Sequence, residues 1–255
     1  MLRDTQLIFI RDMKLALRSP TWLLIGIMQP LLYLFLFGPL MVSVVDHTPG
    51  FPPGGAWQVL TPALIVQTAL FSGSFAGVGL LTEYRVGVVD RFRGTPASRA
   101  ALLFGKVLAQ AVQATAQSVL IVLVTLLVFD LDVSATGLLL SLAIAAVLAI
   151  TLSSGSYALA MVLKSEAAFP ALMNAVLLPL LLLSGVLLPV SEQLAPGWLY
   201  NLARINPLTH VVDAERAAFR GDMSATGLLT GSLVLLVMAV LALLWGTRTF
   251  RRENA

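Results

Sequence analysis

The sequence predicts an all-α membrane protein with six transmembrane helices. Of its 255 residues, 58% are hydrophobic and only 11% are charged, whereas an average soluble domain has about 25% charged residues. A bilayer core is about 30 Å thick and a helix rises about 1.5 Å per residue, so one crossing needs roughly 20 apolar residues. The chain contains six apolar runs of at least that size, separated by short polar segments.

Residues 1–19 predict an amphipathic helix that lies in the membrane interface. On a helical wheel, apolar residues share one arc and cations share another, which predicts an apolar side in the acyl boundary and cations facing lipid phosphates. A secretory signal is the alternative, with an apolar core of about 7 to 15 residues. The run at 22–45 is longer and has no small-residue cleavage pattern, so we expect it to be retained as the first span. The apolar arc consists of Leu2, Phe9, Ile10, Met13, Ala16 and Leu17, and the cationic arc of Arg3, Arg11, Lys14 and Arg18.

Polar and turn-forming residues separate the six runs. The segment 46–56 is rich in Pro and Gly, which cannot continue a helix, and it has no Lys or Arg. Asp130 and Asp132 separate the third and fourth runs, and Lys164 and Glu166 separate the fourth and fifth. The expected spans are residues 22–45, 57–82, 100–129, 134–163, 168–190 and 225–246.

The distribution of cations predicts the orientation. Lys and Arg accumulate in short cytoplasmic loops. Cations precede span one, follow span six and lie between spans two and three and between four and five, whereas the opposite side has them only in its long segment. Both termini are therefore expected on the cytoplasmic side of a bacterial-type cell membrane. The cations of the expected cytoplasmic side are Arg3, Arg11, Lys14, Arg18, Arg85, Arg91, Arg93, Arg99, Lys164, Arg248, Arg251 and Arg252, and those of the opposite side are Arg204, Arg216 and Arg220.

The segment 83–99 is the largest polar segment of the expected cytoplasmic side. Its charges are mixed, with Glu83 and Asp90 among arginines and beside Tyr84 and Phe92. A loop that only sets topology needs cations alone, whereas paired charges near aromatic residues favour docking to a protein surface. Docking is the interpretation we prefer.

The long segment between spans five and six is too polar for a span and too apolar for a free loop. Asn206 before Pro207 favours a turn that divides it into two short amphipathic pieces. The chain either dips into the outer leaflet and returns, which requires shielding of its non-helical backbone, or forms a surface cap. The residues singled out in this segment are Pro196, Trp198, Asn206, Pro207, His210 and Asp213.

Four polar residues share one face of span three: Lys106, Gln110, Gln113 and Gln117. Their spacing of four, three and four residues aligns them along a helix. Polar side chains in a membrane face the bundle interior or water, so this seam either lines a transport pathway or supplies hydrogen bonds for helix packing. Packing is the preferred interpretation, with Lys106 near enough to the cytoplasmic end to snorkel. In span two, Gly73 and Gly77 form a small-xxx-small pair that predicts close helix packing.

The sequence lacks the residues that several kinds of chemistry require. The chain has no Cys and only two widely separated His, so we expect no disulfide and no metal site. It contains no GxxxxGK[ST], HExxH or GxSxG sequence, which argues against nucleotide hydrolysis and proteolysis by this chain. The basic residues lie beside membrane spans, where topology and anionic lipid explain them better than nucleic acid does.

Two sequences carry a resemblance to a known family. LLLSGVLLPVSEQLAPGWLYNLARINPLTHVVDAERAAFRG, residues 181–221, and GLLTEYRVGVVDRFRGTPASR, residues 79–99, resemble segments of the membrane subunit of ABC-2 type exporters, particularly the daunorubicin/doxorubicin resistance permease group. The resemblance covers the whole chain. His210 departs from it, because an aromatic residue is common at this place.

The resemblance implies a specific architecture and set of partners. It implies six helices after an interfacial helix, a homodimer of this chain, and a separate ATPase subunit that binds ATP and Mg, with no cofactor in this chain. It also implies paired re-entrant helices at 191–222 and a coupling region that receives the motion of the ATPase. The matching coupling residues are Glu83, Tyr84, Arg85, Asp90 and Arg91.

The preferred function is therefore the permease subunit of an ATP-driven exporter of a hydrophobic drug-like molecule or lipid-linked substrate. Two alternatives belong to other classes. A stand-alone secondary transporter or channel would need an inverted repeat or buried titratable groups, and Lys106 is the main candidate for such a group. A non-transporting scaffold or immunity protein would bind a partner through its outer segment.

Overall fold

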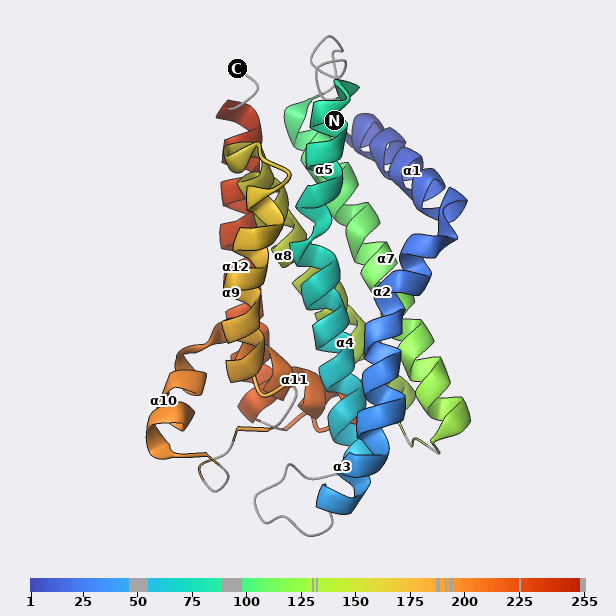
Figure 1. Cartoon of the computed structure of the whole chain (residues 1–255), viewed down its shortest axis with the longest axis vertical. Coiled ribbons are helices and arrows are strands. Elements are labelled where there is room, and N and C mark those ends of the chain that lie inside the picture. Colours follow the sequence, from blue (N-terminus) through green and yellow to red (C-terminus); the bar gives the residue numbers. More distant parts are fainter. Residues whose placement is uncertain are drawn as a thin grey trace.

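The regular structure of the described residues is helical (Figure 1). The structure, a computed structural model, describes residues 1–45, 55–88, 98–129, 131, 133–186, 189–190, 192, 195–224 and 226–252. Within these residues, five stretches are long and apolar enough to cross a membrane, and they coincide with expected spans one to four and six. These stretches are Leu24–Val42, Ala56–Arg85, Arg99–Val128, Ala135–Leu163 and Thr226–Arg252.

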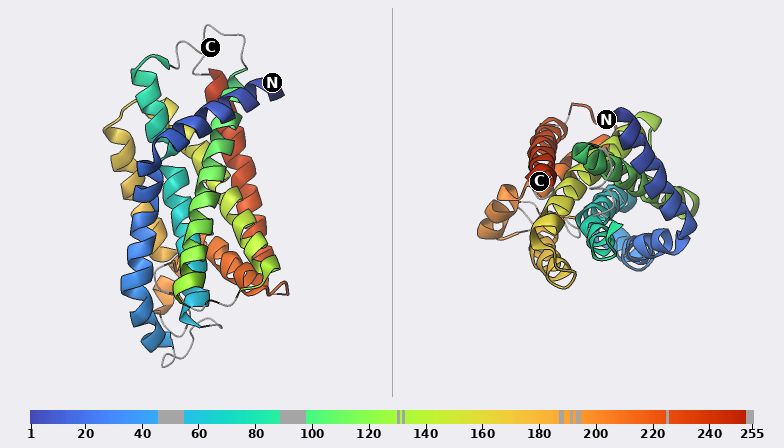
Figure 2. Two further views of the ribbon diagram at one scale, coloured as in Figure 1. Left: turned by 90° about the vertical axis from the view of Figure 1, so that its right-hand side faces the viewer. Right: turned by 90° about the horizontal axis from the view of Figure 1, so that it is seen from above.

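The helices form a bundle along one long axis, with α4 near its centre (Figures 1 and 2). The elements are α1 (Leu2–Arg18), α2 (Pro20–Leu32), the π-helical segment η1 (Tyr33–Phe37), α3 (Gly38–Val45), α4 (Ala56–Ser74), α5 (Ala76–Arg85), α7 (Arg99–Val128), α8 (Ala135–Leu163), α9 (Ala168–Leu183), α10 (Gly197–Ile205), α11 (Pro207–Arg220) and α12 (Thr226–Arg252). α4 is buried along most of its length because α7, α8 and α11 all pack against it.

Prolines explain the change of helix type in the first span. Pro30 and Pro39 lie on either side of η1, within a stretch that is otherwise α-helical. A proline has no N–H to donate within a helix, and a π-helical turn is one way for a helix to change its hydrogen-bond register. The predicted loop 46–56 that follows lies outside the described residues, apart from Gly55 and Ala56.

A break at Phe75 separates α4 from α5 and is bridged by a side chain of α8. Because Phe75 leaves the helical conformation (φ −92°, ψ 1°), backbone groups on both sides of it lack their usual helical partners. Ser156 Oγ donates to the carbonyl of Ser74 at 2.6 Å and accepts from the N–H of Gly77 at 2.8 Å. A Cβ atom at Gly77 would lie 2.8 Å from the Ser156 carbonyl oxygen, and one at Gly73 would lie 2.9 Å from Leu152 Cβ. The close helix packing predicted from these two glycines is confirmed.

α9 is shorter than the fifth span expected at 168–190. The helix has 16 residues and ends at Leu183, whereas a straight crossing needs roughly 20 residues. Ser184 Oγ donates back to the carbonyl of Leu181 at 2.7 Å, and Gly185 follows with a left-handed φ of 74°. A residue with positive φ cannot continue a right-handed helix, so the chain turns here instead of at 190.

Different helices lie at the two ends of the bundle (Figures 1 and 2). α1 and the last turn of α12 lie at one end, where Arg99 Nη1 donates to the carbonyl of Arg251 at 3.1 Å. We call this the terminal end. α10 and α11 lie at the other, which we call the distal end. The chain therefore begins and ends its helical part on the same side of the bundle.

α1 packs against α7 through residues that were not assigned to either predicted arc. Ile8 is buried against Gly105, where a Cβ atom would lie 2.7 Å from Ile8 Cβ. Asp12 follows one helical turn later on the same face. Arg11, expected to face lipid phosphates, instead contacts Asp12 and Glu83. The prediction for Arg11 was wrong because a wheel of α1 alone does not include the acidic side chain that α5 supplies.

Candidate functional site at the junction of α1, α5 and α7

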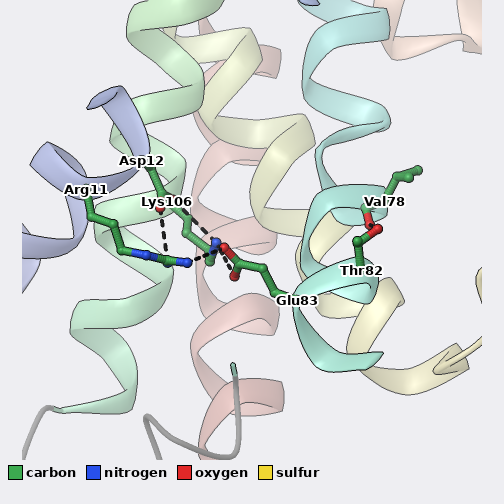
Figure 3. Close-up of polar contacts among 6 residues, drawn as sticks. All are labelled: Arg11, Asp12, Val78, Thr82, Glu83 and Lys106. Carbon is green, nitrogen blue, oxygen red and sulfur yellow. Dashed lines mark hydrogen bonds and ion pairs between the residues drawn. The ribbon is translucent and has the colours of Figure 1, made fainter. Parts of the chain in front are cut away.

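Four charged side chains from three helices meet at the terminal end (Figure 3). Arg11 and Asp12 come from α1, Glu83 from the end of α5, and Lys106 from α7. Arg11 Nη2 lies 2.8 Å from Glu83 Oε1, and Lys106 Nζ lies 2.7 Å from Glu83 Oε2. Arg11 Nη1 and Lys106 Nζ each lie 3.3 Å from a carboxylate oxygen of Asp12. Each carboxylate therefore contacts both cations, and we call these four residues the junction cluster.

The junction cluster is largely withdrawn from solvent. The side chain of Lys106 is only 5% exposed, and those of Asp12 and Glu83 are 14% and 18% exposed. Burial raises the pKa of the Asp12 carboxyl, and the nearby ammonium of Lys106 opposes this rise. A buried ion pair adds little net stability compared with an apolar pair, but removal of one partner leaves an uncompensated charge and is costly. The cluster consequently holds the three helices together only while its positive and negative charges stay balanced.

Local sequence explains why these side chains converge. The absence of a side chain at Gly105 lets the backbone of α1 approach α7, and Lys106 is the next residue along α7. On the α5 side, Thr82 donates its hydroxyl to the carbonyl of Val78 at 3.2 Å, within the last turns before Glu83 (Figure 3). Glu83 still lies inside α5, which continues to Arg85, and its carboxylate reaches Lys106 on α7.

A cavity of about 310 Å³ lies beside the junction cluster. Its polar wall includes Asp12, Glu83, Lys106, Gln110, Gln113 and Tyr157, and the rest is apolar. The amide nitrogen of Gln110 already has hydrogen-bond partners, because Nε2 donates to the carbonyl oxygen and to the hydroxyl of Ser72 on α4, at 3.0 and 2.5 Å. These are the helix-bridging hydrogen bonds expected of a packing residue.

At the distal end, α11 is attached to the bundle by buried polar side chains. Asn206 Oδ1 accepts from the N–H of Leu208 at 3.0 Å and so caps α11, while its Nδ2 donates to the carbonyl of Leu180 on α9 at 2.7 Å. Arg216 Nη2 donates to the carbonyl of Gly185 at 2.8 Å, and its Nε to that of Val59 at 3.4 Å. The guanidinium thus connects α11 to the start of α4 and to the turn after α9.

The other predicted residues of the distal segment are more exposed. Trp198 is 69% exposed on α10, and Pro196 immediately precedes that helix. Asp213 forms an exposed ion pair with Arg204 at 3.5 Å. His210 Nε2 lies 3.0 Å from the carbonyl oxygen of Arg204. The turn predicted at Asn206 and Pro207 is confirmed, since α10 ends at Ile205 and α11 begins at Pro207.

The comparisons with known proteins decide the family. Residues 3–219 match the family described as ABC-2 type transporter. This chain belongs to that family. The matched domain is its membrane permease domain, without an ATPase domain, so the protein is a multi-pass membrane permease. The match decides against the secondary-transporter and scaffold alternatives.

Known permeases align with most of this chain. The daunorubicin resistance ABC transporter permease protein DrrB1 of Streptomyces coeruleorubidus is 27% identical over 241 residues, covering 92% of this chain and 82% of that protein. The putative transport permeases ycf38 of Porphyra purpurea and Cyanophora paradoxa are 27% and 29% identical over 201 residues, covering 78% of this chain and 68% of each relative. Permeases of the family pair with a separate ATP-binding subunit, which binds the nucleotide.

The predicted coupling residues of the permease occupy different environments. Glu83 belongs to the junction cluster, Tyr84 packs against the apolar core at the terminal end, and Arg85 forms an exposed ion pair with Glu166 at 3.0 Å. Asp90 and Arg91 lie outside the described residues. Sequence reasoning placed Glu83 and Lys106 in separate features, and the structure brings them together.

Four polar residues were not identified as functional candidates from the sequence: Arg11, Asp12, Glu215 and Arg216. A lysine within a membrane helix needs a counter-charge, so Lys106 was the signal that an acidic residue must lie nearby. Glu215 is fully buried and accepts a hydrogen bond from Ser141 on α8. The periodicity of α11 was a signal for it, because Glu215 lies three or four residues from Val211, Val212 and Phe219 on the apolar face, whereas Asp213 lies on the opposite face in an exposed ion pair.

Proposed function

We propose that this permease exports a hydrophobic drug-like molecule or lipid-linked substrate, and that the junction cluster passes motion of the ATPase subunit from segment 83–99 to α1 and α7. The observation that carries the proposal is the set of ion pairs by which Glu83, at the start of that segment, contacts both other helices. ATP binding draws the ATPase subunits together and displaces segment 83–99. Because Glu83 is held by cations from α1 and α7, these helices move with it.

Within the coupling region we assign different tasks to neighbouring residues. Both carboxylate oxygens of Glu83 are engaged inside the permease, so Glu83 links the coupling region to the bundle and leaves contact with the ATPase to other residues. Arg85 has a side chain that is 78% exposed and is suited to a protein surface. Asp90 and Arg91, together with Tyr84, complete the proposed ATPase-coupling surface.

The same proposal includes topology and assembly. Six spans cross the membrane with both termini in the cytoplasm, two copies of the chain form a homodimer, and residues 191–222 form a re-entrant segment at the outer side. Support comes from the position of α1 and α12 at one end and of α10 and α11 at the other. The buried bonds of Asn206 and Arg216 would shield the backbone of such a segment.

The substrate class is supported by a relative and by the cavity. DrrB1 is named for daunorubicin resistance. The cavity beside the junction cluster combines charged and amide groups with apolar walls that include Leu15, Phe75 and Leu80. Such a lining suits a molecule with a polar group on an apolar body.

A copurification experiment tests the proposed partner. The tagged full-length chain, extracted from its native membrane in mild detergent, is expected to bring down an ATP-binding subunit with a Walker motif in about equal amount. Arg85→Glu should reduce the retained ATPase severalfold, because it reverses a charge on the proposed surface. Arg204→Glu is the matched control, since Arg204 is also an exposed arginine in an ion pair but lies at the distal end. Equal ATPase retention by both variants would show that Arg85 is not part of the interface. Absence of any ATPase would contradict the proposed partnership.

A further inference from the structure

The cavity beside the junction cluster contains polar atoms that the protein itself leaves unused. Residues of α1, α5, α7 and α8 line it. Three members of the junction cluster are among them, whereas Arg11 is not. Gly79 lines the α5 side, where an added Cβ atom would meet nothing within 4 Å. This side of the cavity therefore leaves room for a ligand to enter.

Tyr157 of α8 is a buried residue whose hydroxyl group is free. The residue is only 6% exposed, and its hydroxyl has no hydrogen-bond partner in the described part of the chain, yet it is not enclosed by protein atoms. It interacts electrostatically with Asp12 and Glu83, which places it near the carboxylates of the cavity wall. A buried hydroxyl without a partner is unfavourable, so a polar ligand would satisfy it.

Two glutamines of α7 add hydrogen-bond acceptors. Gln110 Nε2 donates to the carbonyl of Ser72, which can only accept, so Oε1 is the free atom of this amide. Gln113 is half-buried, and its amide has no hydrogen-bond partner among the residues that the structure describes. The oxygens of Gln110 and Gln113 are not enclosed, unlike Oε1 of Gln117 further along α7. The cavity thus offers two amide oxygens from one face of α7.

The charge that is most open to this cavity is negative. The side chain of Asp12 is 14% exposed, whereas that of Lys106 is 5% exposed. Each carboxylate oxygen of Asp12 contacts one cation at 3.3 Å and can accept a further hydrogen bond. Glu83 contributes charge but no contact, because its Oε1 contacts Arg11 and its Oε2 is enclosed. A cationic donor is therefore better suited to the cavity than an anion.

We propose that this cavity binds a primary ammonium group carried on an apolar body. An ammonium of this kind has three N–H donors and no acceptor, which matches a wall rich in free oxygens. The oxygens available to it belong to Asp12, Gln110, Gln113 and Tyr157, and the apolar body lies against Leu15, Phe75, Val78 and Leu80.

Two sources carry this chemistry. One is an aminophospholipid of the surrounding membrane, and the other is a small amphiphilic amine. As exported cargo, the small amine rests on the proposed export function.

Three probes with the same alkyl chain separate charge from hydrogen bonding. At pH 7, n-octylamine has a charge and three donors, octyltrimethylammonium has a charge and no donor, and 1-octanol has one donor and no charge. The full-length chain in phosphatidylcholine nanodiscs is dialysed against each probe, and empty nanodiscs measure partition into lipid. We expect octylamine to bind about tenfold more tightly than either of the other probes, because hydrogen bonds to a charged group are the stronger ones. Equal binding of octylamine and either other probe would overturn the proposal.

Substitutions place the binding in this cavity. Tyr157→Phe and Gln113→Leu should each weaken octylamine binding about fivefold, as loss of one hydrogen bond requires, and leave octyltrimethylammonium binding unchanged. Tyr33→Phe and Gln117→Leu are the matched controls, because they make the same changes at residues that do not line the cavity. An octylamine preference that survives both Tyr157→Phe and Gln113→Leu, or that the controls reduce equally, would also contradict the proposed site.

A change of lipid distinguishes the two sources. Phosphatidylcholine has no N–H donor, whereas phosphatidylethanolamine has a primary ammonium. If nanodiscs that contain phosphatidylethanolamine bind severalfold less octylamine per chain, the aminophospholipid occupies the site. Unchanged octylamine binding in these nanodiscs assigns the site to the small amine.

The dialysis experiment is independent of the ATPase. Loss of ATPase copurification with the octylamine preference intact would contradict the export function and leave the ammonium site standing. Loss of the octylamine preference with ATPase copurification intact would remove the site and leave the export function standing.

Discussion

Lys106→Met is expected to destabilise the permease by about 3 kcal/mol, because removal of one partner from a buried ion pair leaves an uncompensated charge. The side chain of Lys106 is the most buried of the junction cluster, and its loss leaves Asp12 and Glu83 with Arg11 as their shared cation. α1 then loses one of its links to α7. We expect a lower midpoint of thermal unfolding by circular dichroism, and loss of ATP-driven export while the ATPase subunit stays bound.

A compensating variant separates charge balance from simple loss of packing. Lys106→Met combined with Asp12→Asn removes one charge of each sign and leaves the pair of Arg11 and Glu83. We expect it to recover most of the lost thermal stability. Lys14→Met is the control, because Lys14 is an exposed lysine of α1. An unchanged unfolding midpoint for Lys106→Met, or no recovery in the double variant, would contradict the role assigned to charge balance.

Gly231→Ala is expected to destabilise the contact between α11 and α12 by about 1 to 3 kcal/mol, the usual cost of overpacking. A Cβ atom at this position would lie 2.0 Å from the carbonyl oxygen of His210 and 2.6 Å from Ala214 Cβ. A backbone oxygen within a helix cannot rotate away as a flexible side chain can, so the two helices must separate.

Gly155→Ala is the matched control for this substitution, with the opposite expected sign. It lies inside α8, and the nearest atom to a Cβ built there is Trp245 Cζ3, at 3.9 Å. Alanine is favoured over glycine within a helix by up to about 1 kcal/mol. Thermal unfolding of both variants should therefore show a lower midpoint for Gly231→Ala and an equal or higher one for Gly155→Ala. A shift of both in the same direction would show that the close contact at Gly231 is not what limits the helix approach.

Hydrophobicity and breaker residues predicted most of the helical organisation. The apolar runs at 57–82, 100–129 and 134–163 correspond closely to α4 with α5, α7 and α8, because each run is long and bounded by polar residues. The end of the fifth run was not predicted, because Leu187, Leu188 and Val190 continue the apolar pattern past the turn. Gly185, whose backbone conformation ends the helix, could not be distinguished by hydropathy.

The candidate site was less predictable than the fold because it depends on contacts between distant segments. The spacing of the α7 seam predicted a shared face but gave no partner for any of its members. Glu83 and Lys106 are separated by 23 positions and were assigned to a loop and a span. Only the packing of α1 against Gly105 brings Asp12 to the same place. An alternation of apolar and charged residues in one helix cannot specify such a meeting of three helices.

The most direct measurement of the junction cluster is the distance between α1 and α5 during ATP turnover. The chain has no cysteine, so spin labels attach only at Lys14→Cys and Val86→Cys, both exposed positions. Mixing the labelled chain with an excess of unlabelled chain removes distances between the two copies of the proposed homodimer. In the complex with the ATPase, we expect one narrow distance distribution that is the same with and without ATP, and a broad or shifted one when Lys106→Met is added. A distance that changes with ATP in the otherwise unsubstituted chain, or a Lys106→Met variant that is indistinguishable from it, would contradict the movement of α1 with α5.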